Sequence, residues 1–316
     1  MSTIINILKN INPLKEIKSN SKVEYVVQKL LAFLLIYFSA ALLMEVVVIF
    51  VFNILGYNLL SGEMPRGVWV DLLPLYGFIG FAVLTILYVR IIEKRSLSFM
   101  MLEWNLYFLK ILIKNFFIGI ILVSGIVAVL FVSENYTFIG LGDFNITVVA
   151  MSLLAYIIQG SAEELMCRGF LQNSLSRRVG VPLAIAISSI VFAIPHLSSL
   201  NEINKVSFFI AIINLILVSF LFSLAMIKDN SIGAACGIHV GWNFFLSIVC
   251  GLQVSGGKMS NGIIQFAVKN DKEWLTGGSY GIEASVLLIP ILVFISVAYV
   301  YQMNRKSKGK SREYGI

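Results

Sequence analysis

The chain has 316 residues, of which 58% are hydrophobic and only 13% are charged, and its mean hydropathy is +0.89. Soluble globular domains are about 45–50% apolar and about 25% charged, so this composition excludes a soluble globular fold and predicts an integral membrane protein. The formal net charge is +7. Because the basic residues gather in the tails and connections, we interpret this charge as a topology signal and expect no nucleic-acid partner.

Residues 1–24 are polar and basic, and they lack the apolar core of a signal peptide. Apolar residues between Ile4 and Leu14 recur at helical spacing beside lysines, which favours a short helix on the inner leaflet of the bilayer. Pro13 would break such a helix. An interfacial helix and an unordered cytoplasmic tail therefore both remain open for this segment.

Eight segments are apolar enough to cross a bilayer, whose hydrocarbon core needs about 20 apolar residues in a helix. They run over approximately 26–52, 70–92, 109–133, 146–172, 182–197, 206–227, 232–250 and 284–303. Backbone groups in lipid must pair with each other, so only helices or closed barrels span membranes, and the alternating segments of a barrel are absent from this sequence. The sequence predicts an all-α polytopic bundle of about eight transmembrane helices, forming one domain over 25–303.

Basic residues mark alternate connections of this bundle. They crowd residues 1–24, the connection between the second and third spans, the connection after the fourth span, and the tail 304–316, whereas 134–145 carries only Glu134 and Asp143 as charges. Basic connections stay in the cytoplasm, so we expect both termini there. The short polar tails and the lack of an organelle address fit a bacterial plasma membrane.

Three polar clusters interrupt the apolar segments. Ionisable groups at membrane depth are costly, so they are kept mainly where they act or pair. The histidines of the clusters are the only two in the chain. The polar residues are Glu163, Glu164 and Arg168 in the fourth span, His196 in the fifth, and His239 and Asn243 in the seventh.

Helical spacing divides the two acids by role. Glu164 and Arg168 are four residues apart with the acid first, which is the favourable order for an ion pair on one face. Glu163 points about 100° away from Glu164, which leaves it available. The same spacing of four relates Phe192 to His196 and His239 to Asn243. Each of the three spans thus presents one polar stripe, and we expect the stripes to line one cavity.

The predicted boundaries place two of these residues at different depths. At about 1.5 Å per residue, Glu163 lies about 13 Å from the cytoplasmic end of 146–172, and His196 lies about 22 Å from the same side. A shared cavity therefore requires that the fourth helix continue beyond 172 or that the fifth begin after 182.

The three patterns Glu-Glu-x-x-x-Arg, Phe-x-x-x-His and His-x-x-x-Asn, in this order on successive apolar segments, resemble the motifs of a known family. It is the CAAX protease and bacteriocin-processing (Abi) family of intramembrane proteases, which includes the type II CAAX prenyl endopeptidases. The resemblance covers about 146–250, and it implies hydrolysis of a peptide bond by an activated water. In the implied roles Glu163 is the general base, Glu164 and Arg168 orient the site, His196 holds the water or polarises the carbonyl, and His239 and Asn243 donate hydrogen bonds to the oxyanion.

The chemistry of these residue types is consistent with those roles. Removing a carboxylate from water makes it a better base near neutral pH. Fixed amide and imidazole donors stabilise developing negative charge. A metal site competes with this interpretation, since Glu163, His196 and His239 form a two-histidine, one-carboxylate set of the kind that holds catalytic zinc. The chain has no His-Glu-x-x-His pattern, and we favour the route that requires no cofactor.

Structural interpretations of the same residues also stay open. A single membrane histidine often bonds a neighbouring helix, and Glu164 with Arg168 can be a packed ion pair. We expect Glu45, in the first span, to face the bundle beside a basic group or to line the substrate path. Cys167 is a weaker candidate for a nucleophile, because buried cysteine usually behaves as a small hydrophobe. Residues 251–283 form either a cap or substrate-contacting loop, or a loose connection.

The implied partners are the lipid bilayer and a peptide or protein substrate within or at the membrane, which the sequence does not identify as prenylated or unprenylated. The alternative function is that of a non-catalytic bacteriocin-immunity or scaffold protein of the same fold. A proton-coupled transporter is a third interpretation, because intramembrane carboxylates also serve proton coupling.

Overall fold

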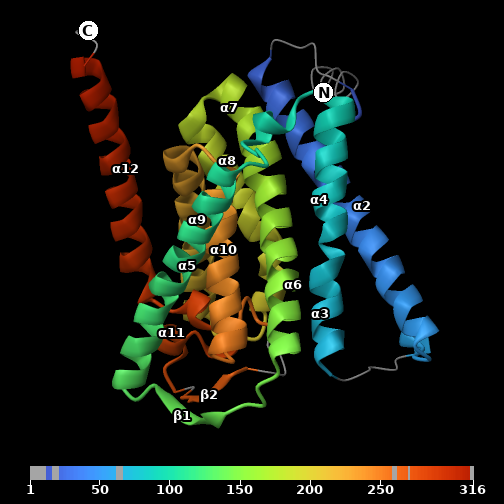
Figure 1. Cartoon of the computed structure of the whole chain (residues 1–316), viewed down its shortest axis with the longest axis vertical. Coiled ribbons are helices and arrows are strands. Elements are labelled where there is room, and N and C mark those ends of the chain that lie inside the picture. The colour runs from blue at the N-terminus through green and yellow to red at the C-terminus, as the bar shows by residue number, and fades with distance from the viewer. Residues whose placement is uncertain (1–11, 16–20, 62–66, 258–261, 270, 314–316) are drawn as a thin grey trace. The chain divides into compact units, whose positions relative to one another are not determined.

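The computed structural model describes residues 12–15, 21–61, 67–257, 262–269 and 271–313, and these contain eight helices long and apolar enough to cross a membrane (Figure 1). The candidate spans are Lys22–Ile54, Val68–Ile92, Leu106–Val132, Ile146–Val179, Val181–Leu200, Lys205–Asp229, Ile232–Val249 and Leu288–Arg305. The predicted all-α polytopic fold is therefore confirmed. Most of the predicted interfacial segment lies outside the described residues.

The fourth and fifth spans differ most from their predicted bounds. The fourth comprises α6 (Ile146–Glu164), a π-helix η4 (Leu165–Gln172) and α7 (Asn173–Val179), so it continues past the predicted end at residue 172. The fifth comprises α8 (Val181–Ala193) and a 3₁₀ segment η5 (Ile194–Leu200). Of the two alternatives that the depth argument required, the longer fourth helix is confirmed.

The chain divides into two compact units, one of Met1–Trp104 with Asn145–Ser188 and one of Asn105–Phe144 with Ser189–Ile316. The boundary between them falls inside α8. The predicted division into a segment 1–24, a transmembrane domain 25–303 and a tail 304–316 stays a prediction.

The first unit is built around α6, which packs against α3 and α4, while α2 packs against α4 and α7. Besides α6, η4 and α7 it contains α2 (Lys22–Ile54), η1 (Leu59–Ser61), α3 (Val68–Gly77), α4 (Ile79–Leu87), η2 (Tyr88–Ile92) and η3 (Leu97–Met100). Large apolar side chains of α2 are exposed, among them Phe38 at 64% and Leu42 at 68%, as suits a surface that faces lipid. Glu45 is also exposed, so the prediction that it faces the bundle is wrong. None of the ion pairs in the described part of the chain includes it, and its pairing with a basic group stays a prediction.

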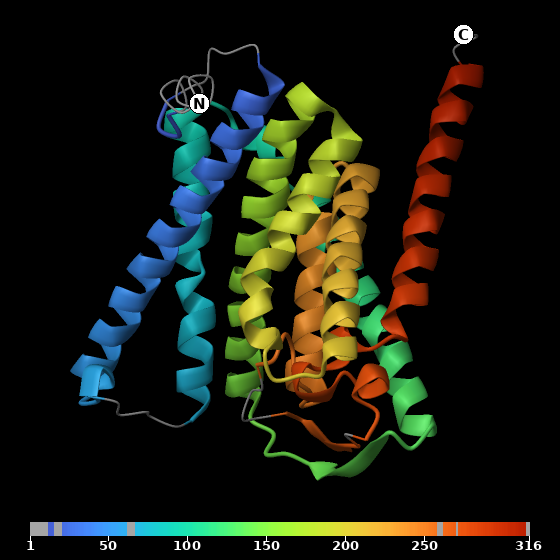
Figure 2. The ribbon, with the colours of Figure 1, turned by 180° about the vertical axis from the view of Figure 1, so that it is seen from behind.

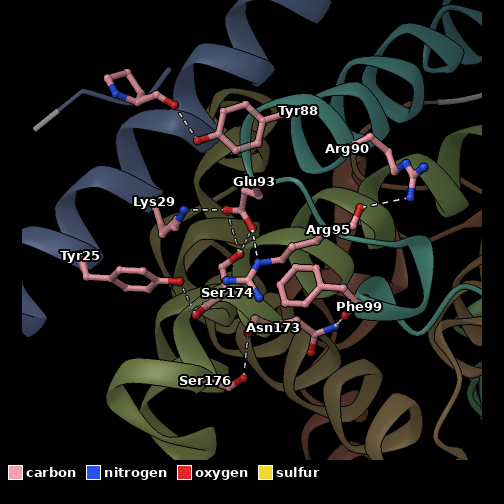
Figure 3. Close-up of polar contacts among 11 residues, drawn as sticks. Tyr25, Lys29, Tyr88, Arg90, Glu93, Arg95, Phe99, Asn173, Ser174 and Ser176 are labelled. Atoms are coloured by element: carbon pink, nitrogen blue, oxygen red, sulfur yellow. Dashed lines mark hydrogen bonds and ion pairs between the residues drawn. The ribbon is translucent and has the colours of Figure 1, made fainter. Parts of the chain in front are cut away.

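A cluster around Glu93 connects α2, η2 and α7 (Figure 3). The Lys29 ammonium donates to the Glu93 carboxylate at 2.6 Å, and both side chains are buried. Ser174 donates to the same carboxylate at 3.3 Å, and the Tyr25 hydroxyl donates to the Ser174 carbonyl at 3.0 Å. Asn173 donates to the Phe99 carbonyl at 3.1 Å. These bonds give the polar residues of α7 partners within the unit.

The second unit is centred on α10, all 13 residues of which are buried between α5 and α9 (Figure 2). Besides the end of α8 and η5, its elements are α5 (Leu106–Val132), β1 (Tyr136–Leu141), α9 (Lys205–Asp229), α10 (Ile232–Phe244), the π-helix η6 (Phe245–Val249), β2 (Ile264–Val268), α11 (Glu273–Thr276), η7 (Gly278–Tyr280), η8 (Ile282–Ala284) and α12 (Leu288–Glu313).

Glycines allow α10 to lie directly against α5. Gly233, Gly237 and Gly241 recur every four residues and therefore share one face of the helix. A Cβ atom at Gly237 or Gly241 would overlap the carbonyl oxygen of Leu112 or Phe116 on α5. Small residues at this spacing are the usual means by which membrane helices approach closely. The contact fixes α10, which carries His239 and Asn243.

The connection 251–283 is structured where it is described. Its strand β2 pairs antiparallel with β1, with a bulge between Phe138 and Gly140. The Tyr136 hydroxyl donates to the Thr276 carbonyl at 2.9 Å, which ties β1 to α11. The described residues are therefore not a loose connection, and the role of this segment as a cap stays a prediction. The small sheet was not predicted.

Candidate functional site

The two acids of the first motif lie at the end of α6, in the first unit. Arg168 donates to Glu164 across 3.0 Å, and neither side chain is exposed. The ion pair predicted from the spacing of four is confirmed. It spans the junction at which α6 passes into the π-helix η4. Short π-helical insertions occur frequently at functional sites, because they re-aim the side chains that follow.

Glu163 is half-buried. The sequence analysis left it without a local partner, but the structure gives it one. The Gln159 amide, one helical turn earlier, donates to Glu163 Oε1 at 2.7 Å. Gln159 is a neutral donor, so this bond orients the carboxylate without neutralising it. The sequence analysis missed Gln159, although its spacing of four from Glu163 was a visible signal.

His196 lies in η5, just after Pro195. Since proline lacks a backbone N–H and interrupts the α-helical bond pattern, α8 tightens here into a 3₁₀ segment. Phe192 and His196 lie on one face, as the spacing of four predicts, although the chain is 3₁₀ and not α-helical at His196. His196 Nδ1 lies 3.0 Å from the Phe192 carbonyl oxygen, and the ring centroids are 5.0 Å apart.

This contact determines the tautomer of the His196 ring. A carbonyl oxygen only accepts hydrogen bonds, so Nδ1 must carry the proton. In the neutral imidazole Nε2 then has a free lone pair, suited to accept a proton from water or to bind a metal.

His239 and Asn243 lie one turn apart on the regular helix α10, as predicted, and both are buried, at 5% and 6% exposure. The His239 ring stacks on Phe222, with centroids 5.1 Å apart and an interplanar angle of 17°. Phe192 contacts the same ring edge-on at 6.1 Å. Phe192 thus touches both imidazoles, and the second unit holds His196 and His239 around one aromatic side chain.

The site residues are accordingly distributed over the two units. The acids and Arg168 belong to the first unit, and both histidines and Asn243 belong to the second. The single cavity expected from the fourth, fifth and seventh spans stays a prediction. Inside either unit, the described residues include no group of three His, Cys, Asp or Glu side chains arranged to hold a metal ion. The candidate ligands Glu163, His196 and His239 come from different units.

The fold and these residues define a polytopic helical membrane protein with ionisable groups inside its spans. Residues 145–245 match the family model described as type II CAAX prenyl endopeptidase Rce1-like. The matched region contains all three motifs, and it confirms the resemblance that they carry. At the general level this family indicates a protease. Comparisons with curated proteins and with solved structures gave no match.

Proposed function

We propose that the protein is an intramembrane endopeptidase that hydrolyses a peptide bond of a membrane-associated peptide or protein. The observation that carries this proposal is the family match over 145–245, which contains all six candidate residues in motif order. The buried Glu164–Arg168 pair and the defined tautomer of His196 support it, because both are local arrangements that the proposed chemistry needs.

In the proposed mechanism Glu163 takes a proton from water as the water attacks the scissile carbonyl. Gln159 orients the carboxylate, and the neutral donor leaves its charge intact for this role. His196 Nε2 accepts a hydrogen bond from the same water. Glu163 then transfers this proton to the leaving amine, so its side chain becomes a carboxylate again.

The tetrahedral intermediate places a negative charge on the former carbonyl oxygen. His239 and Asn243 lie on one face of the rigid, buried helix α10, and they are proposed to donate hydrogen bonds to this oxygen. Donors that are fixed before the reaction stabilise the charge without further reorganisation, and this effect is often the largest single contribution to catalysis.

No cofactor is required in this mechanism. The alternative is a divalent metal such as zinc, held by Glu163, His196 and His239, which would activate the water directly. The proton on His196 Nδ1 and the free Nε2 fit such a ligand, since metal-bound histidines usually donate their other N–H to a carbonyl or carboxylate. Loss of activity on chelation and its return with zinc would favour the metal.

The proposed location is a bacterial plasma membrane, with both termini in the cytoplasm and the substrate in or at the bilayer. The test compares the membrane peptidomes of cells that express the wild type, Glu163→Gln and the matched control Glu134→Gln, whose side chain is exposed outside the spans. We expect peptides that depend on the wild type and the control but not on Glu163→Gln. Identical peptidomes would favour the immunity or scaffold alternative, and a proton-dependent flux lost in Glu163→Gln without cleavage would favour a transporter.

A further inference from the structure

Basic side chains from three separate segments meet beside the Glu93 cluster of the first unit, part of which Figure 3 shows. Lys29 lies in the first turns of α2, Arg95 follows η2, and Arg177 and Arg178 lie in the last turn of α7. These segments adjoin the start of the first candidate span and the ends of the second and fourth. On the proposed topology all three reach the cytoplasmic surface of the bilayer, where the phospholipid headgroups lie.

The ring of Phe99, in η3, contacts two of these cations. The guanidinium carbons of Arg95 and Arg177 lie 4.7 and 4.9 Å from its centroid. A cation within about 6 Å of an aromatic centroid is attracted by the negative face of the ring. Asn173, one turn before Arg177, donates to the Phe99 carbonyl at 3.1 Å. The fold therefore brings two arginines that are distant in the sequence onto one ring and fixes that ring against α7.

The ring of Tyr25, in α2, contacts the other two cations. The ammonium nitrogen of Lys29 and the guanidinium carbon of Arg178 lie 5.2 and 5.4 Å from its centroid. The Tyr25 hydroxyl donates to the Ser174 carbonyl at 3.0 Å, which fixes this ring against α7 as well. Because Tyr25 is buried, its ring is a fixed part of the arrangement and not a mobile surface group.

The contacts of this region join four cations to one carboxylate. Glu93 accepts a hydrogen bond from Lys29 at 2.6 Å and forms an ion pair with Arg95 at 3.3 Å. Arg177 and Arg178 are exposed, and none of the ion pairs in the described part of the chain includes either of them. Like charges that are held near each other repel. Two guanidinium groups thus lie here whose charge none of these ion pairs balances.

A topology signal alone does not account for this arrangement. Basic residues keep a connection in the cytoplasm wherever they lie along it, whereas these cations come from three segments and share two rings. The partner that would balance them is anionic and lies at the membrane surface. Guanidinium groups bind phosphate through paired hydrogen bonds, and basic pockets between spans on the cytoplasmic side bind anionic headgroups. Deeper in its span α2 exposes Leu31 and Leu34, which gives the acyl chains of such a lipid an apolar surface.

We propose that Arg177 and Arg178 bind the phosphate of an anionic phospholipid of the cytoplasmic leaflet, beside the rings of Phe99 and Tyr25. The bound lipid connects α7 with α2 and η3. The fourth span, which carries Glu163, ends just after these arginines, so the lipid also fixes the cytoplasmic end of that span. The binding itself does not depend on whether the protein is a protease.

The direct test measures lipid binding. The full-length protein in a mild detergent is titrated with phosphatidylglycerol or with phosphatidylcholine, and native mass spectrometry counts the lipid molecules that stay bound. We expect phosphatidylglycerol to bind more tightly, because it has a net negative charge and phosphatidylcholine has none. The double variant Arg177→Gln with Arg178→Gln should weaken the binding of phosphatidylglycerol at least about tenfold and leave that of phosphatidylcholine unchanged. Equal affinities of the wild type for the two lipids would overturn the proposal.

The matched control is the double variant Lys110→Gln with Arg305→Gln, which removes the same charge from the second unit. Both side chains are exposed, and neither belongs to an ion pair among the described residues. On the proposed topology both lie on the cytoplasmic side as well. We expect this control to bind phosphatidylglycerol as the wild type does. A loss as large as that of the arginine variant would show that the lipid responds to the total charge of the protein and not to this site.

Two further measurements define the ligand. Arg177→Lys with Arg178→Lys keeps the charge but loses the planar guanidinium groups, so its affinity should lie between those of the wild type and the glutamine variant. Excess inorganic phosphate should displace no more phosphatidylglycerol than sodium chloride of the same ionic strength. Greater displacement by phosphate would indicate a site for free phosphate and would overturn the assignment to a lipid.

A second variant covers the case in which the glutamine double variant fails to fold. Phe99→Leu removes the ring that holds Arg95 and Arg177 together while it keeps every charge. It should weaken the binding of phosphatidylglycerol by a smaller factor than the glutamine variant. Wild-type affinity in Phe99→Leu would then overturn the proposal.

Discussion

The guanidinium of Arg168 lies 3.0 Å from the carboxylate of Glu164, and both side chains are completely buried. Removing one member of such a pair leaves the other charge buried without compensation. The pair also connects the last residue of α6 with the π-helical segment that follows. We therefore interpret it as the structural support that holds the neighbouring Glu163 in position.

Replacement of Arg168 should consequently be costly. We expect Arg168→Met to lower the free energy of unfolding by about 3–5 kcal/mol. Unfolding titrations in detergent micelles would measure this loss. The control is Lys114→Met, which removes an ion pair in which the lysine side chain is 45% exposed. Its partner Asp229 is buried but keeps Asn115 and Lys228 as partners, so this variant should cost less than Arg168→Met. Equal losses in the two variants would show that Arg168 is not the support that we describe.

The proposed base gives the second prediction. Glu163→Ala should abolish detectable cleavage, a loss of at least about 10²–10⁴-fold for a general base, while the protein stays folded and inserted. Gln159→Leu should lower the rate less, because it removes the orienting bond and leaves the carboxylate. Turnover in proteoliposomes, corrected for the amount of folded protein, checks both variants. Turnover of Glu163→Ala close to that of the wild type would contradict the mechanism.

Properties that depend on neighbouring residues were predictable from the sequence. The eight apolar segments were recognised because spanning a bilayer is a matter of length and hydropathy. The Glu164–Arg168 pair was recognised because a spacing of four on a helix sets the contact without help from the rest of the fold. The position of His239 one turn before Asn243 followed for the same reason.

Features that depend on distant partners were not predictable. Hydropathy ends the fourth span at 172, because the residues of α7 are polar, yet the helix continues to Val179. Ser174 and Asn173 are accommodated there by Glu93 and Phe99, which lie far away in the sequence. The hydrogen bonds of Glu283 were not predictable for the same reason, since their donor Ser255 is 28 positions away.

The third prediction concerns the oxyanion donors. His239→Ala and Asn243→Ala should each lower kcat by roughly 10²–10³-fold with a smaller effect on KM. The double variant should lose less than the product of the two single effects, because residues that act as a unit are not additive. Steady-state kinetics on one peptide substrate would measure all three variants.

The same pair of variants discriminates the two catalytic routes. A metal ligand at His239 predicts that its loss is far more damaging than the loss of Asn243, and that a chelator reproduces the effect. Small losses of stability in both variants, with full activity per folded molecule, would leave the two residues a purely structural role.

The fourth prediction tests the contact between α10 and α5. Gly241→Ala should destabilise the protein by about 1–3 kcal/mol, because the added methyl group overpacks a tight interface, and it should lower activity by displacing His239 and Asn243. The control is Gly125→Ala on α5, where a Cβ atom would meet nothing within 4 Å. Unfolding titrations should show that this control is as stable as the wild type or slightly more stable, and its turnover should be unchanged. If Gly241→Ala has the stability and turnover of the wild type, α10 and α5 do not pack as closely as described.

The fifth prediction concerns orientation, and it uses cysteine labelling of intact cells. The native Cys167, Cys236 and Cys250 are buried, and burial raises the pKa of the Cys250 thiol, which lies outside the spans, to about 12. These thiols should not react with a membrane-impermeant maleimide, because the thiolate is the reactive form. Two further cysteines are introduced one at a time at exposed positions, as Asp143→Cys and Lys94→Cys. We expect Asp143→Cys to be labelled from outside the cell. We expect Lys94→Cys to be labelled only after the membrane is opened, because its connection is basic and should lie in the cytoplasm. The reverse pattern would place both termini outside the cytoplasm.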